Sequence, residues 1–175
     1  MHLAYADKCA AKALEWLGQF AVKAEIAGSV RRRRPECSDL DVVLIPQWRE
    51  LKDLMGVVIK RQNLAADEIR RRVKAEGWTM RSDGEDIVSF MAGPVQTDVF
   101  FTTAEAWGSV LLCRTGSAAH NIRLAEKAKA LGGKWHPTRG LYLHGRVIGE
   151  SEEAILEALG LAWVPPAERE VGGGR

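Results

Sequence analysis

Three aspartates within or beside apolar segments constrain this chain more than any other feature. Asp39 and Asp41 open the segment DLDVVLIP, and Asp98 lies in the middle of VQTDVFF. Because side chains alternate along a strand, residues two apart project from one face, so Asp39 and Asp41 are expected to point together. A carboxylate among apolar strand residues is costly without a partner, and converging carboxylates repel one another. The pattern therefore predicts a bound cation, of which Mg²⁺ is the simplest choice.

Length, charge and cysteine content exclude several classes of protein. The 175 residues are 46% hydrophobic, which is enough for the core of one compact domain or two small lobes. The net charge of +2 does not by itself argue for nucleic acid. Three widely spaced cysteines fit neither a disulfide framework nor a zinc site, and no segment approaches the roughly 20 apolar residues of a membrane span. We expect a cytoplasmic protein without a signal peptide or a membrane partner.

The apolar patterns predict an α+β fold in two parts, with a domain over residues 1–103 and a second over 104–175. In the first part we expect helices over 5–19 and 64–76 and strands over 22–27, 41–45, 78–81, 87–92 and 95–101. In the second, mostly helical part we expect helices over 104–112, 118–131 and 154–159, and a hairpin within 135–148 that turns near His144-Gly145. Residues 171–175 are expected to form a disordered tail.

A Gly28-Ser29 turn followed by Arg31 and Arg32 lies just upstream of the first two aspartates. A strand-to-helix turn can offer backbone N–H groups and a hydroxyl to phosphate oxygens, and an arginine can hold terminal phosphates bidentately. A Gly-Ser pair alone is usually only a turn, but its spacing to the aspartates favours a triphosphate site. Phosphoryl transfer needs this kind of charge neutralisation, commonly from two metal ions.

These features together resemble the catalytic motif of the polymerase beta-like nucleotidyltransferases. That superfamily also includes CCA-adding enzymes, drug-modifying enzymes and toxin–antitoxin nucleotidyltransferases. The downstream sequence narrows the choice, because Thr115-Gly116-Ser117, Asn121 and the ending ALGLAWVPPAERE resemble the thumb of family X DNA polymerases. The resemblance spans about residues 14–170. It implies a palm with a mixed β-sheet and flanking helices, followed by a mostly helical thumb, as in the small viral member of the family.

The resemblance also implies roles for individual residues. Asp39, Asp41 and Asp98 would be the catalytic metal ligands for two Mg²⁺ ions, with Mn²⁺ as an alternative, and Asp98 would lie near the primer 3′-hydroxyl. The residues implied in nucleotide binding are Gly28, Ser29, Arg32, Cys113, Arg114, Gly116, Ser117 and Asn121. Asn121 would face the base from its minor-groove side, and the alternative is that it is simply a polar residue on a helix surface.

Two departures from the family pattern lie in the second part. Family members commonly place an aromatic pair before Thr-Gly-Ser, where it excludes a 2′-hydroxyl, but this chain has Cys113 and Arg114. We therefore expect weakened selectivity against ribonucleotides. Family members also often carry an arginine four residues after the asparagine, where this chain has Ala125 and the nearest arginine is Arg123. Contacts to the templating base are expected to be rearranged.

Only about 27 residues precede Gly28, which is too few for the lyase and fingers regions of larger relatives. DNA would then be held by basic surfaces, for which the candidates are Lys127, Lys129, Lys134, Arg139 and Arg146. The expected function is a monomeric DNA-directed DNA polymerase that uses dNTPs on primer-template or gapped DNA, in short-gap filling during repair. The alternatives are a template-independent nucleotidyltransferase acting on RNA ends, a small molecule or a protein, and a catalytically silent, antitoxin-like binding module.

Overall fold

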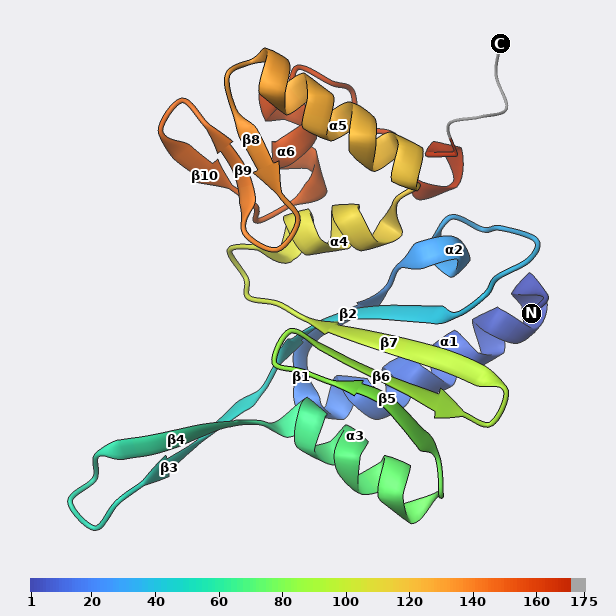
Figure 1. Cartoon of the computed structure of the whole chain (residues 1–175), viewed down its shortest axis with the longest axis vertical. Coiled ribbons are helices and arrows are strands. Elements are labelled where there is room, and N and C mark those ends of the chain that lie inside the picture. The colour runs from blue at the N-terminus through green and yellow to red at the C-terminus, as the bar shows by residue number, and fades with distance from the viewer. Residues whose placement is uncertain (171–175) are drawn as a thin grey trace.

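The computed structural model describes residues 1–170, whose helices and strands form two parts stacked along the long axis of the molecule (Figure 1). The first part contains α1 (Leu3–Leu17), η1 (Gly18–Phe20), β1 (Ala21–Ile26), α2 (Gly28–Arg31), β2 (Leu40–Pro46), β3 (Trp48–Lys52), β4 (Val58–Asn63), α3 (Leu64–Ala75), β5 (Thr79–Asp83), β6 (Ile87–Ala92) and β7 (Val95–Phe101). The second part contains α4 (Trp107–Thr115), α5 (Ala118–Ala130), β8 (Lys134–His136), β9 (Gly140–Leu143), β10 (Arg146–Ile148), α6 (Glu152–Ala158) and η2 (Pro166–Glu168).

The mixed α+β class expected from the sequence is confirmed. The expected tail over 171–175 lies outside the described residues. Within residues 1–170, no helix combines the length and the apolar character that crossing a membrane requires.

A five-stranded mixed sheet with the order β1-β2-β7-β6-β5 organises the first part. The interior strands β2 and β7 run parallel, and all the other pairs in this sheet are antiparallel. Central strands are covered on both faces, which explains the nearly continuous apolar run of β2. In the register of the central pair, Asp41 lies directly opposite Asp98. The topology thus brings together two aspartates that are far apart in the sequence.

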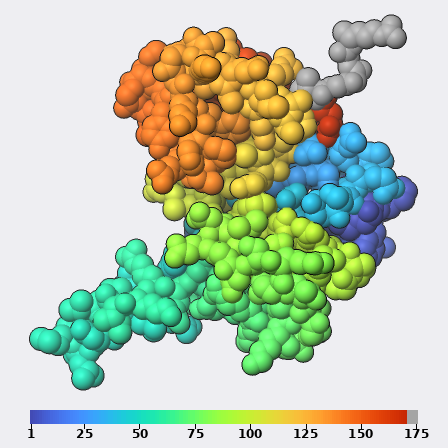
Figure 2. Space-filling model, in the orientation of Figure 1, coloured from blue at the N-terminus to red at the C-terminus, as the bar shows by residue number. Residues whose placement is uncertain are grey.

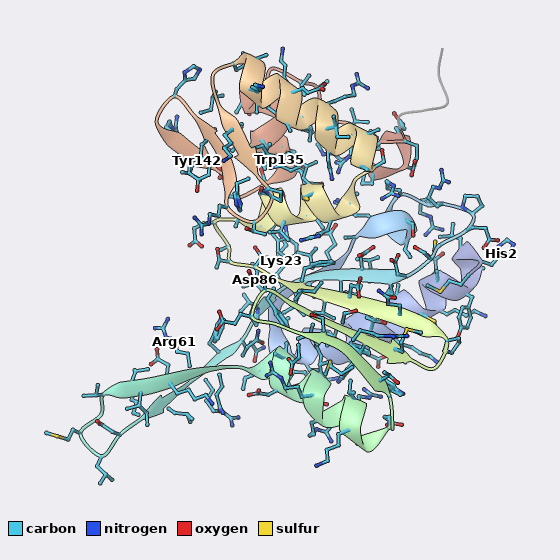
Figure 3. All side chains as sticks on the ribbon, in the orientation of Figure 1. His2, Lys23, Arg61, Asp86, Trp135 and Tyr142 are labelled. Atoms are coloured by element: carbon cyan, nitrogen blue, oxygen red, sulfur yellow. The ribbon has the colours of Figure 1, made fainter. Side chains whose placement is uncertain are left out.

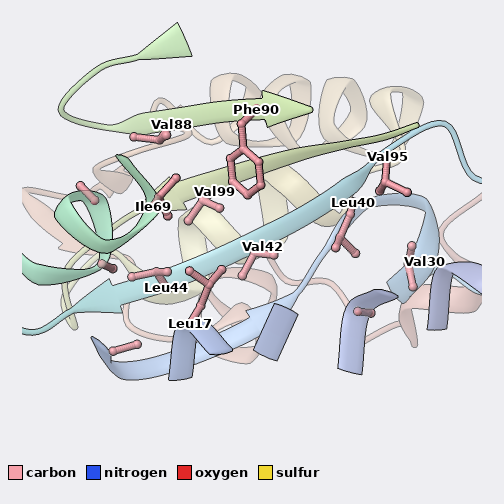
Figure 4. Packing of buried hydrophobic residues seen from close by; sticks show 14 of the residues in the cluster. Leu17, Val30, Leu40, Val42, Leu44, Ile69, Val88, Phe90, Val95 and Val99 are labelled. Carbon is pink, nitrogen blue, oxygen red and sulfur yellow. The ribbon is translucent and has the colours of Figure 1, made fainter. Parts of the chain in front are cut away.

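The two faces of the sheet pack against different parts of the chain. One face packs against α1 and α3, and Figure 4 shows Leu40, Val42, Leu44 and Val99 in this cluster. Residues of the opposite parity point the other way, so Val43 and Phe100 join a separate cluster with Trp107 and Leu111 of α4. Asp41 and Asp98 share the parity of that second set. Their carboxylates therefore face the second part of the chain.

The second part contains more β-structure than the sequence indicated. The expected turn at His144-Gly145 is present, but β8 adds a third strand to give a sheet of order β10-β9-β8. Trp135 and Leu141 are cross-strand partners on the buried face of this sheet, whereas Tyr142 is exposed (Figure 3). The helix expected over 104–112 instead spans Trp107–Thr115, so Cys113 and Arg114 lie in its last turn.

A two-stranded ribbon, β3–β4, was not predicted from the sequence. It follows β2 directly and extends away from the body of the molecule (Figures 1 and 2). Every residue of β3 is exposed, as are the first four residues of β4. We refer to residues 48–63 as the arm.

Candidate active site

Two of the three predicted aspartates form the centre of the site. Asp41 of β2 and Asp98 of β7 are partners in the parallel register and lie on the face of the sheet directed toward α4. Asp39 lies two residues before Asp41, in the bend that precedes β2, and accepts a 2.7 Å hydrogen bond from Ser38 Oγ. All three side chains are partly buried. The structure therefore places three carboxylates at one end of the central strand pair.

The electrostatics of Asp41 reflect this crowding. Burial, followed by repulsion from Asp39 and Asp98, raises the pKa of Asp41 to about 7, and the nearby cations of Arg114 and Arg32 only partly offset the shift. The pKa of Asp41 therefore reflects its burial first and the two neighbouring carboxylates second.

Asp98 is held by two side chains that sequence reasoning did not identify. Ser89, its cross-strand partner on β6, donates a hydrogen bond to Oδ1. Gln96 Nε2 lies 3.3 Å from each carboxylate oxygen. Strand alternation could have found Gln96, since it lies two residues from Asp98 on the same face. The strand pairing that selects Ser89 was not available from the sequence.

Gly28 and Ser29 lie against the carboxylates. Gly28 has a φ of +60°, and a β-carbon at this position would overlap Asp41 Oδ2, so only glycine fits here. The Ser29 hydroxyl is buried and has no hydrogen-bond partner within residues 1–170. Buried polar groups almost always have partners, so this one indicates a missing ligand. A phosphate oxygen has the right chemistry to be that ligand.

Arg32 is close to the site but already has partners. Its Nε lies 2.6 Å from Glu170 Oε1, and its Nη1 donates to the backbone carbonyl of Thr115. Gly116 follows that carbonyl, and a β-carbon there would lie 3.2 Å from Arg32 Nη1. The structure therefore brings Arg32 and Gly116 together, as the sequence-based assignment requires, with Glu170 as an additional anionic neighbour that the assignment did not include.

Arg31 takes part in a different arrangement. It forms two hydrogen bonds with Glu152, at 2.8 and 2.9 Å, and an ion pair with Glu25 at 3.0 Å. Glu152 is also bound by the fully buried Arg169, with a shortest distance of 2.7 Å. We call Arg31, Glu152 and Arg169 the buried triad. Because its members come from α2, α6 and the C-terminal segment, the triad connects the two parts of the chain.

The remaining candidate nucleotide-binding residues lie at the junction of α4 and α5. Arg114 stacks over the Phe100 ring, 4.0 Å from its centroid, and burial raises the pKa of the Cys113 thiol. Ser117 caps α5 and donates to the Arg169 carbonyl at 2.8 Å. Asn121 Nδ2 donates to the Cys113 carbonyl at 2.8 Å, while its buried Oδ1 has no partner within residues 1–170. Asn121 is therefore directed toward the end of α4 and is not simply a residue of the helix surface.

The five basic residues predicted to contact DNA are all exposed. Lys127 and Lys129 lie on α5, and Arg139 lies in the β8–β9 turn. Lys134 and Arg146 line one shallow hollow along β8, β9 and β10. Among the described residues, none of the five has an ion-pair partner, so each is available to a polyanion.

The donor set at the aspartates fits a hard divalent cation. Within residues 1–170, no group of three or more His, Cys, Asp or Glu side chains is already arranged to hold an ion. The chemistry is nevertheless appropriate, because carboxylate oxygens are the ligands that Mg²⁺ prefers, and Asp39 and Asp98 lie near enough to Asp41 to raise its pKa. Asp39, Asp41 and Asp98 are the residues that would hold such ions.

Comparison with known families adds an independent observation. Residues 110–170 match the family described as DNA polymerase beta thumb. The matched segment contains Arg114, Gly116, Ser117 and Asn121, but none of the three aspartates. A comparison with curated proteins gives no match. The thumb match supports a polymerase beta-like family, a nucleotidyltransferase type of enzyme and DNA binding in general.

Proposed function

We propose that this chain is a DNA-directed DNA polymerase of family X, which adds dNMP from a dNTP to a primer 3′-hydroxyl. The observation that carries the proposal is the in-register pair Asp41 and Asp98 beside Gly28 and the unpartnered hydroxyl of Ser29. The thumb match supports a polymerase rather than another member of the nucleotidyltransferase superfamily. We further propose residues 1–103 as the palm and 104–175 as the thumb, and short-gap filling in repair as the task of a monomeric enzyme.

Each group at the site has a distinct task in this reaction. Asp39, Asp41 and Asp98 would hold two Mg²⁺ ions, which would supply positive charge for the transfer of the nucleotidyl group and the departure of pyrophosphate. Ser29 binds a phosphate oxygen, and Arg32 exchanges Glu170 for the triphosphate. Asp98, held by Ser89 and Gln96, would accept the proton of the primer hydroxyl, whose oxygen attacks the α-phosphate in line as pyrophosphate leaves. Arg114 and Asn121 border the sugar and the base.

Primer extension by Asp98→Asn tests the assignment. This change keeps the shape of the side chain but removes its charge, and we expect incorporation to fall by about 10³-fold or more while thermal unfolding is unchanged within a few degrees. The matched control is Asp86→Asn, because Asp86 is an exposed aspartate in the β5–β6 turn. Incorporation by Asp98→Asn at more than about a tenth of the wild-type rate would exclude the proposed role.

The choice of template separates the proposed polymerase from the remaining alternatives. Gapped, primed and single-stranded substrates are each offered the four dNTPs singly, with Mg²⁺ or Mn²⁺. A polymerase incorporates the nucleotide complementary to the template base and prefers the gapped substrate. Incorporation that ignores the template would indicate a template-independent nucleotidyltransferase, and the absence of incorporation from a folded protein would indicate a binding module.

A further inference from the structure

The arm, residues 48–63, exposes several large apolar side chains that the rest of the protein does not bury. Leu54 and Met55 at its tip are 107% and 89% exposed, and Trp48, Val57 and Ile59 are more than half exposed. An isolated two-stranded hairpin is at best marginally stable in water, and exposed apolar surface of this extent marks an interaction site. The arm therefore has the properties of a surface that binds a partner.

The tip of the arm is a turn whose conformation is fixed by hydrogen bonds within it. The Asp53 carboxylate accepts hydrogen bonds from the backbone N–H groups of Met55 and Val57, each at 2.9 Å. Gly56, with a φ of +80°, closes the turn through a 3.0 Å bond to the Asp53 carbonyl. Because the backbone polar groups are satisfied locally, Leu54 and Met55 are left pointing outward.

The two faces of the arm differ in charge. Cross-strand partners share a face, so Glu50 and Arg61 lie together and form a 3.0 Å ion pair, with Lys52 3.9 Å from Glu50. The opposite face carries the pairs Arg49–Gln62 and Leu51–Lys60. Within residues 1–170, neither Arg49 nor Lys60 has an ion-pair partner. This second face thus presents two cations without an ion-pair partner, a side-chain amide and no acid of its own.

We propose that the arm binds duplex DNA, with Arg49 and Lys60 at the phosphates and the Leu54-Met55 tip against the bases. A two-stranded ribbon fits the major groove, and apolar side chains contact thymine methyl groups there. The strands of the arm are about 17–20 Å long at 3.3 Å per residue, which is longer than the groove is deep. The charge of the second face complements a polyanion. The inference rests on the proposed function only in taking DNA as the substrate.

The test is the salt dependence of binding to a blunt, mixed-sequence duplex, with EDTA and without nucleotide. Each phosphate contact contributes about 0.9 to the slope of log K against log salt concentration. We therefore expect Arg49→Ala/Lys60→Ala to lower the magnitude of that slope by about 1.8. The control Lys74→Ala/Arg81→Ala makes the same charge change at exposed positions on α3 and β5, and its slope should equal that of the wild type.

A tip variant probes the apolar contact separately. Leu54→Ser/Met55→Ser should weaken binding about five-fold or more at every salt concentration without changing the slope, because no phosphate contact is lost. Thermal unfolding of each variant verifies that the protein is folded. Equal slopes for the arm pair and the control pair would overturn the proposal.

Partners of the arm other than duplex DNA would give different results in these experiments. If the arm variants alter self-association, or binding to vesicles that contain phosphatidylserine, while duplex binding is unchanged, the partner is a second copy or a membrane and the proposal is wrong. Failure here is also separable from failure of the proposed function. Equal slopes for the arm pair and the control pair in an enzyme that extends primers normally would contradict only the arm. A chain that binds duplex through the arm but extends no primer would contradict only the polymerase.

Discussion

Two carboxylates withdrawn from solvent, Glu152 on α6 and Asp41 on β2, have opposite electrostatic environments. Burial disfavours the charge of both, but hydrogen bonds and positive charge from Arg31 and Arg169 lower the pKa of Glu152. Asp41 faces other carboxylates, and its pKa rises to about 7. Glu152 is neutralised within the protein, whereas Asp41 is not. The difference teaches that burial alone does not set the direction of a carboxylate's pKa shift, because the sign of the neighbouring charges also decides it.

Removing Glu152 should have the largest effect on stability. Glu152→Ala leaves Arg31 and the fully buried Arg169 without their shared carboxylate, and breaking a buried ion pair in this way costs about 3–5 kcal/mol. Urea unfolding measures the loss. The neighbouring Glu153 is exposed, so Glu153→Ala should change the unfolding free energy by less than about 0.5 kcal/mol. Equal effects of the two substitutions would show that the buried triad does not stabilise the fold.

Asp41→Asn should raise the stability of the fold, in contrast to Glu152→Ala, and should lower primer extension. Without metal at pH 8, the amide removes the cost of burying a carboxylate beside two others. The unfolding free energy should rise by roughly 2–4 kcal/mol, since the pKa rise from 3.8 to about 7 corresponds to about 4 kcal/mol at about 1.36 kcal/mol per unit. Primer extension should fall by about 10²-fold or more. A variant that is both less stable and fully active would remove the distinction between the two carboxylates.

The pH dependence of stability should separate the two acids. The pKa of Glu152 is lowered on folding, so its contribution is present above the ordinary value of 4.5 and is lost as the pH falls through the folded value. The pKa of Asp41 is raised, so stability is lost as the pH rises from its ordinary value of 3.8 through about 7. In thermal melts without metal, the amount by which Asp41→Asn is more stable than the wild type should grow across pH 4–7. The amount by which Glu152→Gln is less stable than the wild type should shrink below about pH 4.5.

The same contrast explains which parts of this structure the sequence could reveal. Strands 87–92 and 95–101 were predicted at their observed bounds, because alternation and the Gly93-Pro94 turn are local signals. The phase of Asp39 and Asp41 was equally local. The role of Glu152 could not be read from local sequence. Beside Ser151 it resembles a helix-capping residue, and only the tertiary fold brings it to Arg31. The arm was missed because its strands lack a buried face and hence an apolar period.

Glu170→Gln should show whether Arg32 serves as a structural ion-pair partner, as Arg31 does for Glu152, or belongs to the site around Asp41. Arg32 is paired with Glu170 in this structure, yet its charge also acts on Asp41. If the triphosphate must displace the Glu170 carboxylate, neutralising it should lower the KM for dNTP about three- to ten-fold with little change in kcat. Glu168→Gln, two residues earlier in η2, is the matched control. An unchanged KM would place Arg32 with the structural ion pairs.

The smallest expected effect concerns the sugar, at the edge of the carboxylate site. Cys113 has a small side chain, and Arg114 lies over the Phe100 ring, so in the proposed nucleotide site neither would form a flat wall against a 2′-hydroxyl. Wild-type protein should therefore prefer dCTP over CTP by less than about 100-fold, which is the limit of a pocket that discriminates weakly against one hydroxyl. Cys113→Tyr should raise this preference about ten-fold, and Cys113→Ser should leave it unchanged. A strong wild-type preference would show that other residues form the wall, and would leave Arg114 chiefly as a cation for Asp41.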